Sequence, residues 1–94
     1  MSIYSRRQIT ARYRELLKSE PRLHAIQTTA SEFGHSAETI EQVITQSAVT
    51  AYLHALGLDG APAAAVLKAA AEAFGMDTGV LMDAVQEQHA AMEA

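Results

Sequence analysis

The chain repeats one pattern of prolines, alanines and glycines after 41 residues, and this repeat constrains its fold more than any other feature. The identical pairs are Pro21 and Pro62, Ala30 and Ala71, Phe33 and Phe74, and Gly34 and Gly75. Ser36 likewise falls on Asp77, and both residue types cap the amino ends of helices. Proline at a helix start and glycine after a helix end are typical punctuation. The repeat therefore predicts two copies of one unit, each made of two helices joined by a tight turn.

Apolar residues recur at helical spacing throughout the sequence, so we expect an all-α fold with five helices. Ile9, Tyr13 and Leu16, for example, lie at i, i+4 and i+7. Ser19 is expected to cap the second helix and Gly57 to end the third. The predicted helices cover residues 6–18, 21–33, 36–56, 62–74 and 77–92. We expect one compact domain over residues 1–94, with the basic first helix at 6–18, a first unit at 21–56 and a second unit at 62–92.

The composition excludes most catalytic and metal-binding apparatus. The 94 residues contain no cysteine, so disulfides, thiolate zinc sites and cysteine nucleophiles are absent. No two of the four histidines are four residues apart, and no phosphate-binding loop or nucleophile elbow occurs. We therefore expect no enzyme, no cofactor, no metal site and no small-molecule substrate. His54 is expected in the core and His35 in solvent.

The amino-terminal sequence has no apolar run behind its positive charges, so we do not expect a secretory signal. The longest charge-free stretch, residues 42–58, is too short and too polar to span a bilayer. The first helix is basic and amphipathic, but its apolar face lacks Trp and Phe, so we do not expect it to bind a membrane. A cytoplasmic protein fits these features best.

Charge is distributed unevenly along the chain. The first 22 residues hold six cations and two acids, a net charge of +4, and the other 72 hold Lys68 and nine acids, a net charge of −8. One interpretation is that the first helix meets an anionic partner. The other is that the two oppositely charged ends pair with each other, within one chain or between chains.

The first copy of the repeat resembles the helix-turn-helix DNA-binding superfamily over residues 26–44, and the second copy resembles it more weakly over 67–85. The likeness depends on Ala30 at the helix contact, Gly34 in the turn, and Ile40 and Val43 anchoring the second helix. In that superfamily the second helix enters the major groove. The resemblance implies base-reading positions at His35, Ser36, Glu38, Thr39 and Gln42. Phosphate contacts would then come from Arg7, Arg12, Arg14, Lys18 and Arg22.

The sequence departs from this superfamily in its charge. Residues 30–58 contain no Lys or Arg, although Glu32, Glu38 and Glu41 are present, and cations provide most of the affinity for DNA. Two functions therefore stay open. One is a small DNA-binding regulator of transcription, of phage or plasmid type. The other is a protein–protein interaction module, an acidic adaptor or an inhibitor that mimics DNA. The position of the first-helix cations relative to the amino end of the third helix discriminates between them.

The second half of the third helix is apolar on two sides. Val49, Leu53 and Leu56 lie opposite the stripe that begins at Ile40. A helix that is apolar on both sides is normally buried on both sides. The following helices could cover this second face, or it could form the seam of a homodimer.

Overall fold

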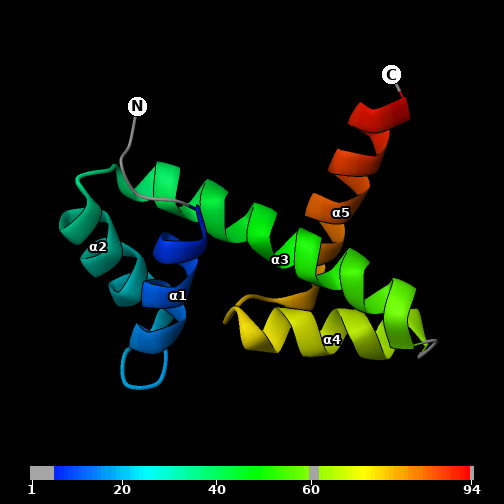
Figure 1. Cartoon of the computed structure of the whole chain (residues 1–94), viewed down its shortest axis with the longest axis horizontal. Helices are drawn as coiled ribbons and strands as arrows, with labels where there is room; N and C mark the ends of the chain where they lie inside the picture. The colour runs from blue at the N-terminus through cyan, green and yellow to red at the C-terminus, as the bar shows by residue number, and fades with distance from the viewer. Residues whose placement is uncertain (1–5, 60–61, 94) are drawn as a thin grey trace. The chain divides into compact units, whose positions relative to one another are not determined.

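The computed structural model of the chain consists of five α-helices, which confirms the all-α class (Figure 1). It describes residues 6–59 and 62–93, without the side chains of residues 58–59 and 91–93. The helices are α1 (Arg6–Leu16), α2 (Arg22–Phe33), α3 (Ala37–Asp59), α4 (Ala63–Ala73) and α5 (Thr78–Glu93). No strand occurs in these two described stretches.

Contacts between Cα atoms divide the chain into two compact units of 47 residues each. The amino-terminal unit comprises residues 1–47, and the carboxy-terminal unit comprises residues 48–94. The boundary falls inside α3, so residues in the first half of this helix pack into the core of the amino-terminal unit. Residues in its second half pack into the core of the carboxy-terminal unit. Each unit therefore contains two whole helices and one half of α3.

The amino-terminal unit buries one face of each of its helices. In this unit α1 and α2 run in opposite directions and are joined by a short turn (Figure 1). The buried apolar residues are Ile9, Tyr13 and Leu16 of α1, Ala25, Ile26 and Ala30 of α2, and Ile40 and Ile44 of α3. Thr29 is also fully buried, and its hydroxyl donates to the carbonyl oxygen of Ala25 at 2.8 Å. This bond satisfies the hydroxyl within its own helix, so its burial leaves no polar group unpaired.

The carboxy-terminal unit has a core of smaller side chains. Its buried apolar residues are Ala48, Val49 and Tyr52 of α3, Val66, Leu67, Ala70 and Ala71 of α4, Phe74 and Met76 of the turn, and Leu81 of α5. The alanines allow α4 to approach its neighbours closely, because they carry only one methyl group. Beyond Val85, the side chains of residues 86–90 are all exposed, so this stretch of α5 contributes nothing to the core.

The two units share two backbone hydrogen bonds around their turns at the 41-residue spacing. His35 N–H donates to the Ala30 carbonyl at 3.0 Å, and Met76 N–H donates to the Ala71 carbonyl at 2.9 Å. Equivalent bonds also begin the helices that follow the turns, from Ile40 to Ser36 and from Leu81 to Asp77, both at 3.1 Å. Gly34 and Gly75 both adopt a left-handed conformation, with φ of 69° and 64°. The repeat read from the sequence is thus a repeat of turn geometry.

Three predicted helix ends were wrong. The first helix ends at Leu16 instead of Lys18, and a turn follows it. Pro21, not Ser19, is the amino-terminal cap of α2. Gly57 does not end the third helix, which continues to Asp59. A single glycine in a helix costs only about 1 kcal/mol relative to alanine, and buried neighbours such as Tyr52 offset that cost.

Candidate nucleic-acid interface

The turn between α2 and α3 has the geometry that the sequence predicted. It comprises residues 34–36, between the last residue of α2 and the first residue of α3. Gly34 has φ 69° and ψ 32°, and its N–H donates to the Ala30 carbonyl. An L-amino acid is strained in this conformation, whereas glycine is not. Ala30, the predicted contact position, and Ile40, the first predicted anchor, are buried, whereas the second anchor, Val43, is half-buried.

Two of the predicted base-reading side chains form the cap of α3. The Ser36 hydroxyl oxygen accepts the Thr39 N–H at 3.1 Å, and the two hydroxyl oxygens are hydrogen-bonded at 2.9 Å. Serine at this position satisfies an amide that the helix itself leaves unpaired. Ser36 and Thr39 therefore stabilise the start of α3, and contact with a base would compete with this role.

His35 does not point freely into solvent, so the prediction of a solvated side chain was wrong. The residue is half-buried, and its Nε2 atom is buried without a hydrogen-bond partner. The reason is visible at the equivalent position of the other unit, where Met76 is buried. This position of the turn thus packs a side chain against the core in both copies. His35 is therefore less accessible than the exposed residues Glu38 and Gln42.

Glu38 and Gln42 form the exposed surface of the first turns of α3. They lie four residues apart on one face and are both exposed. A glutamine amide can pair with adenine, and a carboxylate can accept from the amino group of cytosine. The carboxylate of Glu38 is also favourable near the positive end of the helix. Ser36 is exposed too, but its hydroxyl is bonded to Thr39, so Glu38 and Gln42 are the better candidates for base contacts.

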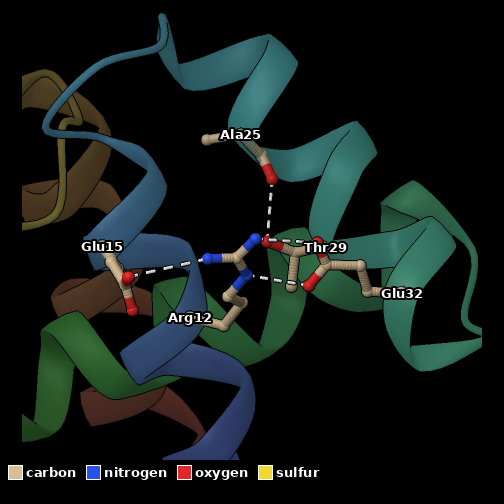
Figure 2. Close-up of polar contacts among 5 residues, drawn as sticks. All are labelled: Arg12, Glu15, Ala25, Thr29 and Glu32. Carbon is tan, nitrogen blue, oxygen red and sulfur yellow. Dashed lines mark hydrogen bonds and ion pairs between the residues drawn. The ribbon is translucent and has the colours of Figure 1, made fainter.

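Arg12 links α1 and α2 through a bidentate ion pair with Glu32. Its Nε and Nη2 atoms donate to the two carboxylate oxygens at 2.8 and 2.9 Å, and its Nη1 atom lies 3.7 Å from Glu15 (Figure 2). The hydrogen bond from Arg12 lowers the pKa of Glu32, and the same bond raises the pKa of Arg12. Sequence reasoning missed this pair. The available signal was that Arg12 follows Ile9 by three residues, beside the buried face of α1.

Arg22 makes the second interhelical ion pair, from α2 to α3. Its Nη2 atom donates to Glu41 at 3.2 Å, while its Nε atom is buried without a hydrogen-bond partner. Arg22 also lies against buried Tyr13: burial raises the pKa of this phenol, and the charge and hydrogen bond of Arg22 lower it. Arg12 and Arg22 are thus both engaged inside the unit in the absence of a ligand. Their assignment to phosphate contacts stays a prediction.

The other predicted phosphate-contact residues, Arg7, Arg14 and Lys18, are all exposed. Arg7, Thr10 and Arg14 lie at i, i+3 and i+7, so they share one strip of α1. The hydroxyls of Thr10 and Ser47 are hydrogen-bonded at 2.9 Å, so this strip borders α3 near Ser47. Ser47 lies 11 residues after Ser36, about 16 Å along the helix. Arg7 and Arg14 therefore lie beside α3 near Ser47, and not at its amino end.

The predicted dimer-surface residues of α3 differ in exposure. Val49 is only 2% exposed, Leu56 is half-buried and Leu53 is 45% exposed. Leu53 is thus the most exposed of the three. His54 is exposed, so the expectation of a core histidine was wrong: Tyr52 occupies the core in this part of α3.

In residues 6–59 and 62–93, no group of three or more His, Asp or Glu side chains could hold a metal ion. None of the helices described there is long and apolar enough to cross a membrane. No protein-family model, curated protein or solved structure matches the chain.

Proposed function

We propose that the amino-terminal unit binds duplex DNA, with the exposed face of α3 directed at the major groove. The observation that carries this proposal is the exposed first turn of α3 after a three-residue turn with left-handed Gly34. Glu38 and Gln42 are the base-reading residues in this arrangement. The charge of the unit is also compatible, since its six cations and five acids give a net charge of +1.

Cations along one side of α3 provide the phosphate contacts. Arg7 and Arg14 flank the helix near Ser47, and Arg22 reaches it at Glu41. The Arg22–Glu41 pair is a single hydrogen bond of 3.2 Å, whereas Arg12 makes two shorter bonds to Glu32. A phosphate therefore displaces Glu41 from Arg22 more easily than it displaces Glu32 from Arg12. Arg22 changes partner on binding, and Arg12 keeps its own.

Fluorescence anisotropy with a random-sequence duplex at low salt tests the proposal. We expect a dissociation constant of about 10⁻⁴ to 10⁻⁶ M at physiological salt and tighter binding at low salt. Replacing Arg7 and Arg14 by alanine should weaken binding about tenfold or more. Lys68→Ala is the matched control, because it removes a positive charge from the carboxy-terminal unit and should leave affinity nearly unchanged. Absence of binding at low salt, or equal losses in both variants, would refute the proposal.

A protein-interaction module is the second candidate. It is favoured by the position of Arg7 and Arg14, which lie beside α3 near Ser47 and not at its amino end, and by the two interhelical ion pairs. Arg12 and Arg22 neutralise Glu32 and Glu41 within the unit, which reduces the positive charge available to an anionic ligand. If the protein does not bind duplex DNA at low salt, an acidic adaptor is the better explanation of its function. Selection from a random DNA library separates the two further, because an adaptor enriches no sequence. In a DNA-binding protein, Gln42→Ala should relax the enriched sequence.

A further inference from the structure

The carboxy-terminal unit carries an open hollow of about 480 Å³ beside the turn that joins α4 to α5. Its lining includes the apolar side chains of Leu67, Ala71 and Met76 and the charged side chains of Lys68, Glu72 and Asp77. The charged residues around the hollow carry a net charge of −1. The whole unit has one cation and six acids, a net charge of −5. An apolar side chain with positively charged neighbours suits this surface best.

The amino-terminal unit presents such a side chain. Leu23, in the first turn of α2, is 67% exposed, more than Leu53, Val80 or Met82. It follows Lys18 and Arg22 closely in the chain, and the one acid in that stretch, Glu20, pairs with His24. Arg22 is paired with Glu41 inside the unit, so exposed Lys18 is the cation of this segment that can meet a partner. An apolar side chain this exposed gains free energy when a partner covers it.

We propose that the chain associates with a second copy of itself, head to tail, with Leu23 of one copy seated in the hollow of the next. The leucine lies against the apolar lining of the hollow, and Lys18 faces Glu72 and Asp77. This contact is heterologous, because two different surfaces meet. It uses none of the residues expected to read bases, although Lys18 and Arg22 beside Leu23 are also predicted phosphate contacts.

Sedimentation velocity of the whole chain at several concentrations tests this contact. The mean mass should rise with concentration above the 10.1 kDa of one chain. Leu23→Ser should raise the dissociation constant about tenfold or more, since it removes the buried apolar group. Leu53→Ser is the matched control, a leucine that is 45% exposed on α3. It should leave the mass unchanged.

A second variant blocks the hollow without touching the core. Ala64 lines the hollow and is exposed, so Ala64→Trp fills it from the surface of α4. Circular dichroism and thermal unfolding of each variant verify that it folds. Leu23→Ser and Ala64→Trp should each be monomeric alone, whereas an equimolar mixture should form a pair and no larger species. The mixture retains one intact leucine and one open hollow, so a single contact can form.

Three results would overturn the proposal. The first is a wild-type mass that stays at one chain up to millimolar concentration. The second is loss of association in Leu53→Ser but not in Leu23→Ser, which would indicate the seam on α3 instead. The third is a mixture of the two variants that stays monomeric, because a heterologous contact requires that they complement each other.

Discussion

The positive charge of Arg22 links helices in the fold, and the same charge is proposed to bind a phosphate of DNA. Its side chain contacts buried Tyr13 of α1 and carboxylate Glu41 of α3, while its own backbone begins α2. A cation in such a place links three helices as long as no stronger anion competes for it. Arg12 links two helices in the same way through Glu32. The fold and any nucleic-acid site therefore share the same guanidinium groups.

Glu32 should titrate below the ordinary glutamate pKa of about 4.3, because Arg12 holds its carboxylate in the charged form. The pKa is lower in the folded than in the unfolded state. The ion pair therefore stabilises the fold at pH values above the ordinary pKa, and this contribution is lost as pH falls through the lowered value. Carboxyl-detected NMR titration measures this pKa. Arg12→Ala should return it to the ordinary value, and an unchanged Glu32 pKa in that variant would contradict the assignment.

Gly34→Ala and Gly57→Ala should change stability in opposite directions. A methyl group at either position meets no atom within 4 Å, so steric clash contributes to neither substitution. Gly34 has φ +69°, where alanine is strained, and the variant should lose about 1 kcal/mol of unfolding free energy. Gly57 lies inside α3, where alanine is the better helix former, and that variant should gain about 0.5–1 kcal/mol. Urea denaturation followed by circular dichroism measures both, and equal signs would refute the conformational explanation.

Most of the fold could be predicted at the level of helices, because local chemistry fixes helices and turns. Gly34 predicted the turn correctly, and the spacing of Ile9, Tyr13 and Leu16 predicted the buried face of α1. The second half of α3 was predicted less well, because its buried face is set by residues distant in the chain. Tyr52 lies in the core where His54 was expected, and Val49 is buried where a dimer surface was one alternative. Periodicity alone does not identify which face of a helix meets a neighbour.

The sequence predicted which residues lie at the candidate site. It did not predict which of their side chains already have hydrogen-bond partners within the protein. The resemblance located Glu38 and Gln42 on the exposed face of α3. It did not indicate that Ser36 and Thr39 bond to each other, or that Arg12 pairs with a glutamate 20 residues away. Contacts between side chains on different helices depend on how the helices are rotated about their axes. That rotation follows from packing of the whole unit.

Ser36→Ala should destabilise the protein by about 1 kcal/mol, because it removes the hydroxyl that accepts the Thr39 N–H at the start of α3. Ser31→Ala is the control, since Ser31 is exposed inside α2 and its replacement should change stability by less than about 0.5 kcal/mol. Chemical denaturation of the wild type and of each variant measures the differences in unfolding free energy. Ser36→Asp should keep the cap and the stability. Loss of stability in Ser36→Asp equal to that in Ser36→Ala would contradict the capping role.

At the scale of the whole chain, the internal repeat carries two different charge patterns. The amino-terminal unit has a net charge of +1 and the carboxy-terminal unit a net charge of −5, although their turns share the same hydrogen bonds. The position of His35 is taken by Met76 in the second copy, and that of Gln42 by Asp83. A surface with no cation on α5 is unsuited to DNA. The same turn geometry therefore supports one nucleic-acid site in the proposed function, and the second copy is left for protein contact.

The salt dependence of DNA affinity should report how many cations of the whole chain meet phosphates. Each neutralised phosphate of duplex DNA contributes about −0.9 to the slope of log affinity against log salt. If both interhelical ion pairs stayed closed, Arg7, Arg14 and Lys18 would give a slope of about −3. If Arg22 leaves Glu41 for a phosphate, as proposed, the slope should be about −4, and Arg22→Ala should return it to about −3.

Glu41→Gln should raise the affinity for DNA at each salt concentration, because Arg22 no longer has to leave a carboxylate. The matched variant Glu87→Gln on α5 should have little effect. Anisotropy titrations at four or more salt concentrations measure these slopes. A wild-type slope of about −3 that Arg22→Ala leaves unchanged would mean that Arg22 keeps its structural partner throughout.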